Sequence, residues 1–330
     1  MELETRDIIS GVTVDKRHVG RKSTSMEKDA FIKTFNVLLR ELNIKEIVTE
    51  AHVQIAALMH PEKGRYKEKG VLHSLDVWRA AKNLTKRLHV AGMMSGQKTI
   101  LGWIKDIVNH FWFACQHASN REEFMVVWRG VLHHVSGVHE WALGRCLHGP
   151  LGDEREVIPP GSIAHVALSE IVLNRRWLKD IEKFLTFRTT SQLESFQNHI
   201  LMYAAKRFAF SYETYEARTF LAALDYNHHN HRPVHVNNKG QVSQKRLYSK
   251  KSQRYRVQTV KVAKDYSYIP DLQIKILGLR LQSARGLPRK RSYRPDDPRF
   301  LGPLSGIVPP PTADLVQSQV HRGQEMPSAP

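Results

Sequence analysis

Apolar side chains recur every three to four residues along much of the chain, which predicts amphipathic helices. One such run begins after Ser25 and predicts a helix to about Leu42. Residues 76–188 carry the same spacing in several runs, with a break at the Pro-Pro-Gly of 159–161, so this stretch is predicted to be mainly helical. A further helix is expected from Ser191 to about Ala205.

Shorter runs rich in β-forming residues lie between the first helices. Residues 7–14, 44–49 and 70–74 are predicted to be strands, so the first fifty residues have the order strand, helix, strand. Strands that alternate with helices predict an α/β layer with at least one parallel pair.

The periodic pattern fades after Asn230. Residues 231–263 are polar and basic, and a short helix is predicted over 272–281. From residue 285 onward Pro, Arg, Gly and Ser dominate, so this tail is expected to be disordered.

Basic charge is concentrated in the same C-terminal region. The formal net charge is +18. Residues 231–300 hold 18 Lys and Arg against 4 Asp, a local excess of +14. Such a stretch attracts polyanions, and nucleic acid is the expected partner. The other interpretation is a solvated basic tail.

Two classes of protein are excluded by composition. No run of eighteen apolar residues occurs, so no membrane span and no membrane partner are predicted. Two cysteines, Cys115 and Cys146, do not make a disulfide scaffold and fit a reducing compartment. The basic run at 288–291 and the expected DNA partner predict a nuclear location, and a homo-oligomer is compatible with the sequence.

Glu50 directly follows the strand predicted over 44–49. A carboxylate at the carboxyl end of a buried strand is where open α/β sheets place ligand-binding groups, and Mg²⁺ prefers oxygen ligands. The alternative is a solvated turn residue.

Glu194 and Asn198 are four residues apart in the helix predicted from Ser191, so they share one face. Ser191 and Glu194 also have the spacing of a capping box, in which the glutamate bonds back to the serine amide. A metal-binding role and a capping role are both open from spacing.

Four potential soft-metal ligands fall within fifteen residues of one another: His134, His139, Cys146 and His148. Three imidazoles and a thiolate can form a zinc site, although this spacing is not that of a standard zinc finger. Chance clustering among 18 histidines is the alternative.

Basic residues lie beside aromatic residues over 206–227. This combination favours phosphate contact and base stacking, although the aromatic side chains fit a core equally well. The predicted nucleic-acid-binding residues are Lys206, Arg207, Arg218, Lys245, Arg246, Lys250 and Lys251.

Several of these segments together resemble cut-and-paste DNA transposases of the DD(E/D) type, with similarity to a Kolobok-like superfamily and to insertion-sequence transposases that carry T-S-x-x-E-x-x-N. The likeness spans roughly residues 2–280. The segments that carry it are 48–52, 73–79, 109–112, 132–135, 139–141, 190–198, 206–207, Arg218 and 221–227.

The resemblance implies a ribonuclease-H-like core whose acids bind Mg²⁺ for DNA cleavage and strand joining. Glu50 and Glu194 match the second and third acids, while Asp76 and Asn198 match signature positions. Two positions depart from the family pattern: Glu50 stands where the family has Asp, and Arg79 replaces the His of D-x-x-H. The first acid and an N-terminal DNA-binding domain are expected to be missing, because Met1 stands just before what reads as the second strand.

The predicted fold is therefore α/β, a ribonuclease-H-like mixed sheet with a large helical insertion and a basic, partly disordered C-terminal tail. The predicted parts are 1–75 and 189–230 for the core, 76–188 for the insertion, 231–284 for a basic extension and 285–330 for the tail. The predicted function is that of a transposase-derived DNA-binding protein with impaired catalysis and a Mg²⁺ site that does not function. The alternative is a non-catalytic, domesticated DNA-binding or protein-interaction module.

Overall fold

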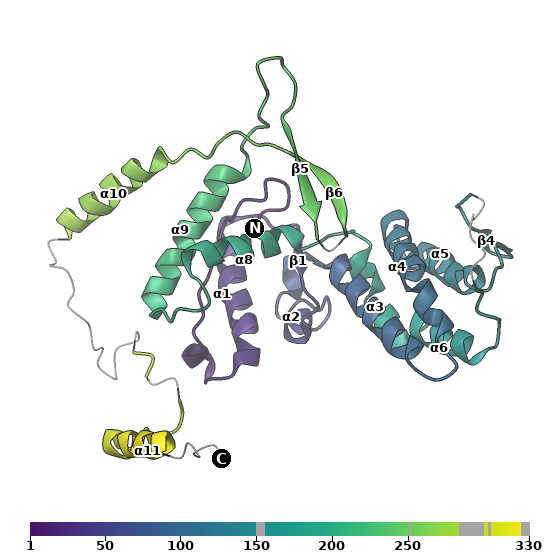
Figure 1. Cartoon of the computed structure of the whole chain (residues 1–330), viewed down its shortest axis with the longest axis horizontal. Helices are drawn as coiled ribbons and strands as arrows, with labels where there is room; N and C mark the ends of the chain where they lie inside the picture. The colour runs from purple at the N-terminus through teal and green to yellow at the C-terminus, as the bar shows by residue number, and fades with distance from the viewer. Residues whose placement is uncertain (150–155, 251, 284–299, 303–304, 325–330) are drawn as a thin grey trace, which may run out of the picture. The chain divides into compact units, whose positions relative to one another are not determined.

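The computed structural model describes residues 1–149, 156–250, 252–283, 300–302 and 305–324 (Figure 1). The protein is of mixed α/β type, with mostly helices and three small two-stranded sheets among these residues. The chain divides into two compact units. The first comprises residues 1–10 and 35–208, and the second comprises residues 11–34 and 209–330.

Helices dominate the first unit, as the periodic pattern predicted. Several begin after a residue whose side chain accepts a backbone N–H, such as Asp76, Asn120 and Ser162. The helices are α2 (Val53–Leu58), α3 (Val77–Gly92), α4 (Thr99–His117), α5 (Arg121–His134), α6 (Ile163–Val172), α7 (Arg175–Leu178) and α8 (Ser191–Tyr203), with 3₁₀ turns η3 (Lys67–Lys69) and η4 (Ile181–Phe184). Helix α1 (Met26–Glu41), also predicted, crosses the boundary between the units.

Helices α3, α4, α5 and α6 pack side by side and enclose the main hydrophobic core (Figure 1). Phe111, Phe124 and Trp128 are fully buried there in mutual ring contacts. The Trp128 indole N–H donates to the Val172 carbonyl at 2.9 Å, so this large side chain leaves no buried donor unsatisfied.

Strands β1 (Glu46–Thr49) and β2 (Leu72–Leu75) pair in parallel, with Ile47 opposite His73 and Thr49 opposite Leu75. The parallel pair predicted from sequence is thus confirmed. A second, antiparallel pair in this unit, β3 (Glu140–Trp141) and β4 (Gly144–Arg145), was not predicted.

The second unit is built around helix α9 (Tyr212–Asn230). Its other elements are 3₁₀ turns η1 (Lys16–Val19) and η2 (Ser23–Ser25), strands β5 (Gln244–Ser249) and β6 (Arg254–Thr259), and helices α10 (Tyr268–Gln282) and α11 (Thr312–Gln324). Strands β5 and β6 form an antiparallel hairpin inside a region for which no element was expected.

Two predictions at the chain ends need correction. Residues 7–14 were expected to form a strand, but none of them is hydrogen-bonded into a sheet with any described residue. The tail after residue 284 was expected to be disordered, yet α11 is helical. Residues 284–299, 303–304 and 325–330 of that tail lie outside the described residues.

Candidate metal centre and acidic strand ends

The carboxyl ends of β1 and β2 carry Glu50 and Asp76. The strands are parallel, so both acids follow the same edge of the sheet, and the Asp76 amide donates to the Thr49 carbonyl at 3.1 Å. The sequence analysis predicted that Glu50 would bind a metal ion at this edge of the sheet.

Glu50 is held by a cation from the first turns of α3. Its Oε2 atom lies 2.6 Å from Nη1 of Arg79, and both side chains are partly exposed. A carboxylate paired with a guanidinium has part of its charge neutralised before any metal ion arrives. Arg79 is the residue that departs from the D-x-x-H signature, and in the structure it contacts the acid of the neighbouring strand end.

Asp76 is buried and has a structural partner for each carboxylate oxygen. Oδ1 accepts the Trp78 amide at 2.9 Å and so caps α3, while Oδ2 accepts the hydroxyl of Thr190 at 2.7 Å. The Thr190 bond joins the end of β2 to the start of α8, although the two residues are 114 positions apart.

Glu194 lies one turn into α8 and is partly buried, whereas Asn198 is exposed. The predicted capping box does not form: Thr190 is the residue before the helix, and the Ser191 amide bonds to the hydroxyl of Thr189 at 3.2 Å. The Thr190 side chain makes no capping bond to α8, and its hydroxyl donates to Asp76 instead. Glu50 and Glu194 do not belong to any group of three or more potential metal ligands among the described residues.

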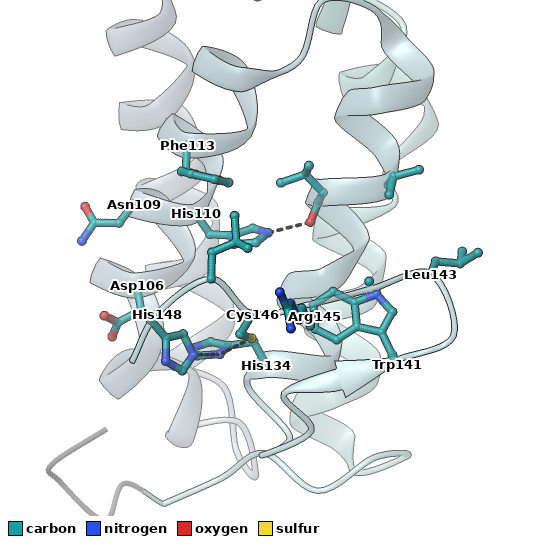
Figure 2. Close-up of a pocket in the computed structure, with 14 residues that line it drawn as sticks. Asp106, Asn109, His110, Phe113, His134, Trp141, Leu143, Arg145, Cys146 and His148 are labelled. Atoms are coloured by element: carbon teal, nitrogen blue, oxygen red, sulfur yellow. Dashed lines mark hydrogen bonds between the residues drawn. The ribbon is translucent and has the colours of Figure 1, made fainter. Parts of the chain in front are cut away.

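The one such group in the described part of the chain is the predicted one. His134, His139, Cys146 and His148 each present a ligand atom, and the four atoms lie within 4.8 Å of one another. Nδ1 of His134 is 3.3 Å from Sγ of Cys146 and 3.3 Å from Nε2 of His148 (Figure 2). Ligand atoms around a tetrahedral zinc ion are about 3.4–3.8 Å apart. The cluster could therefore hold a metal ion with small adjustments.

The β3–β4 hairpin brings the four residues together. His134 ends α5, and the Cys146 amide donates to the His139 carbonyl at 2.8 Å, so this pair extends the hairpin ladder by one step. Trp141 packs this hairpin onto α5 by stacking on His133. A Cβ atom on Gly130 would come within 2.5 Å of the Trp141 ring, so glycine is needed at this position for the contact.

Burial affects two of the candidate ligands in opposite ways. Burial, followed by the neighbouring histidines His148 and His139, lowers the pKa of His134 to about 4, so its ring is neutral at pH 7. His148 bonds through Nδ1 to the Gly149 carbonyl at 2.7 Å, which leaves Nε2 with its lone pair toward the cluster. Burial raises the pKa of the Cys146 thiol, and a bound metal ion would have to displace that proton.

A mainly apolar cavity of about 640 Å³ opens beside the cluster (Figure 2). Its wall is formed by α4, α5 and the segment from Trp141 to His148. His110, on α4, turns into this region and bonds to the Val127 carbonyl at 2.7 Å. The cluster thus forms one end of a largely hydrophobic hollow.

The predicted nucleic-acid-binding residues lie in both units. Lys206 and Arg207 are exposed just after α8, and Arg218 on α9 lies over the ring of Phe210. Lys245 and Arg246 are exposed on β5, and Lys250 is exposed in the turn that follows. Lys251 is outside the described residues.

Sequence reasoning missed the cations on the second strand of the hairpin. Arg254 and Arg256 on β6 are exposed cations, and Tyr248 lies opposite Tyr255. The signal available was the absence of any acidic residue from Gln244 to Thr259.

Comparison of the chain with protein-family models, curated proteins and solved structures gives no match. The transposase resemblance therefore stays a prediction that rests on its motifs. No helix within the described ranges has the length and apolar character needed to cross a bilayer.

Proposed function

We propose that this chain is a nucleic-acid-binding protein derived from a ribonuclease-H-like DNA transposase, with impaired strand cleavage. The proposed nucleic-acid binding is supported mainly by the cationic β5–β6 hairpin. Lys245, Arg246, Arg254 and Arg256 are all exposed, and none forms a salt bridge with a carboxylate among the described residues. Cations without acidic partners attract phosphates at little desolvation cost.

The parallel β1–β2 pair, with acids after both strands, supports a ribonuclease-H-like ancestry. The residues do not fit a working Mg²⁺ site, however. Two-metal phosphoryl transfer needs several carboxylates with open oxygen atoms. Glu50 is paired with Arg79, and both oxygens of Asp76 are engaged by Trp78 and Thr190.

The His134, His139, Cys146 and His148 cluster is proposed to bind Zn²⁺. Imidazole and thiolate ligands select zinc over the hard ion Mg²⁺. Four protein ligands complete a tetrahedral shell and leave no position for a reacting water, so the role is structural. The ion would cross-link the end of α5 to the β3–β4 hairpin.

Salt-dependent binding tests the nucleic-acid proposal. The full-length protein is titrated against labelled DNA at several salt concentrations, with Mg²⁺ present and strand cleavage monitored in parallel. Binding should weaken with salt without cuts, and Lys245→Gln/Arg246→Gln should reduce the slope of log affinity against log salt by about 2. The control is Lys63→Gln/Lys69→Gln, which removes the same charge from exposed positions in the first unit and should leave the slope unchanged.

Three outcomes would contradict parts of this proposal. Cuts that disappear in Glu194→Gln would mean that an acidic metal site works. Equal slopes for the two double variants would remove the hairpin from the interface. No binding at low salt would reject nucleic acid as the partner and favour a protein-interaction module.

Metal analysis of the purified protein tests the zinc proposal. About one zinc ion per chain is expected, and Cys146→Ser or His148→Ala should lose most of it. His117→Ala removes an exposed histidine of α4 that is not in the cluster and is the matched control. Full zinc retention in both cluster variants would reject the site.

A further inference from the structure

The register of the β5–β6 hairpin sorts its side chains into two chemically different faces. Arg246 lies opposite Val257 and Tyr248 lies opposite Tyr255, so these four residues share one face. The intervening positions place Lys245, Arg254 and Arg256 on the other face, together with Leu247 and Ser249. One face is thus aromatic and the other is mainly cationic.

The aromatic face is open to solvent. Tyr248 is 53% exposed and Tyr255 is 75% exposed, and Val257 beside them is 61% exposed. The two tyrosine rings lie 5.1 Å apart at their centroids, tilted by 57°. Exposed tyrosines of this kind present flat π-surfaces to solvent.

The hairpin is presented from a well-anchored base. The His235 amide donates to the Val260 carbonyl and the Ser243 amide donates to the His235 carbonyl, so a third segment pairs with its open end. Arg232 donates to the Val262 carbonyl at 2.6 Å, and Lys264 donates to the buried carboxylate of Asp225 on α9 at 3.1 Å. These bonds fix the orientation of the strands relative to the second unit's main helix.

We infer that the β5–β6 hairpin binds an unpaired nucleic-acid strand, with bases stacked on Tyr248 and Tyr255 and phosphates held by the neighbouring cations. This inference rests on the proposed nucleic-acid-binding function and specifies which form is bound. In a duplex the base faces are covered by adjacent base pairs, so tyrosine rings find no stacking surface. In a single strand every base offers one, whatever its sequence.

The test compares single strands with a duplex. The full chain is titrated with fluorescein-labelled oligothymidylate, with oligouridylate of the same length and with a blunt DNA duplex. Tyr248→Leu/Tyr255→Leu removes the rings and keeps apolar side chains. It should weaken binding to at least one of the two single strands by about tenfold or more and change duplex affinity less than about twofold.

Two controls separate stacking from folding and from charge. Trp78→Leu removes a partly exposed aromatic ring of α3 that lies outside the hairpin and should leave all affinities unchanged. Arg256→Gln acts on the other face and should weaken single-strand and duplex binding together. Circular dichroism of each variant verifies the fold.

The outcomes distinguish the two proposals. A selective loss on oligothymidylate or on oligouridylate supports the inference and identifies DNA or RNA as the bound strand. Duplex binding with no effect of the double tyrosine variant overturns the inference and leaves the proposed function intact. Absence of binding to all three probes overturns both.

Discussion

At the scale of single residues, Asp76 and Glu50 occupy equivalent strand ends but differ in burial. Asp76 is 2% exposed and satisfies the Trp78 amide and the Thr190 hydroxyl, whereas Glu50 makes a partly exposed ion pair. Asp76→Ala should lower the free energy of unfolding of the first unit by about 2–4 kcal/mol, because it removes a helix cap and leaves a buried hydroxyl without its partner.

Glu50→Gln is the matched comparison, since partly exposed ion pairs contribute less than about 1 kcal/mol. Urea unfolding of both variants measures the difference. Similar losses of unfolding free energy in the two variants would mean that the hydrogen bonds of Asp76 do not stabilise the fold.

His73 predicts a pH dependence of stability. Its side chain is buried on β2, with Nε2 2.8 Å from Oγ1 of Thr49. Burial, followed by the charge of Lys183, lowers its pKa to about 4 from an ordinary value near 6.5. The neutral ring is favoured in the folded state, so its stabilisation is complete above pH 6.5 and declines as pH falls toward 4.

His73→Gln retains a hydrogen-bonding group and cannot titrate. The variant should lose less stability between pH 6.5 and pH 4 than the natural chain does, in thermal unfolding at matched salt. His134 has its pKa lowered in the same direction, so part of the acid sensitivity should persist in the variant. If the variant has the same pH dependence of stability as the natural chain, the pKa of His73 is the same in the folded and unfolded states.

At the scale of elements, the sequence predicted the helices that bury one hydrophobic face. Helices α4 and α5 bury one side each, and their apolar spacing was readable from Ile100 to Val135. The β5–β6 hairpin buries neither face: Tyr255 and Val257 alternate with arginines on β6, but Leu247 and Tyr248 are adjacent on β5, so the alternation was too short to predict the pair. Residues 7–14 have strand-like composition but form no strand in the described structure, because composition cannot specify strand pairing.

The site shows the same division between residue type and geometry. The four candidate ligands at positions 134, 139, 146 and 148 were chosen by residue type alone, yet the hairpin that gathers them was not predicted. Glu50 was placed correctly at a strand end, whereas Asp76 was predicted only as a signature position at the start of the helical stretch. The carboxylate of Glu50 contacts Arg79, 29 residues away, and that of Asp76 contacts Thr190, 114 residues away. No local sequence pattern encodes contacts over such separations.

Gly130 links an element to the candidate metal centre. Gly130→Ala places a methyl group where the Trp141 ring packs, so the β3–β4 hairpin must shift away from α5. We expect a loss of about 1–3 kcal/mol in the free energy of unfolding and weaker zinc retention, because His139 and Cys146 move with the hairpin.

Gly102→Ala on α4 is the control, since a methyl group there meets nothing within 4 Å. It should stabilise the protein slightly through helix propensity. Thermal unfolding and zinc content measured on both variants test the argument. A stable Gly130→Ala protein with full zinc would show that Trp141 does not position the hairpin.

At the scale of the whole molecule, the two units differ in how they are stabilised. Most of the described buried apolar side chains belong to the first unit. Among the described residues of the second unit, those that are buried are Ala222, Asp225 and His229, so a polar network takes the place of a large core there. Hydrogen bonds and ion pairs contribute less net stability than extensive apolar burial, so the second unit is expected to be the weaker one.

Metal removal should therefore act on one unit only. Thermal unfolding of the full chain is expected in two steps, with the second unit unfolding first, because the chain has more than one compact unit. A zinc ion that binds only the folded cluster stabilises the unit that contains the cluster. The stabilisation grows with the logarithm of the ratio of free zinc concentration to the dissociation constant. The cluster lies in the first unit, so a chelator such as phenanthroline should lower the upper transition and leave the lower one in place.

Hydrogen exchange followed by mass spectrometry assigns each step to its unit. With chelator, peptides from α5 and the β3–β4 hairpin should lose protection, while peptides from α9 should not. His148→Ala without chelator should reproduce the effect, and adding chelator to that variant should change nothing further. If both transitions shift together, the metal stabilises the whole chain and the two units do not unfold independently.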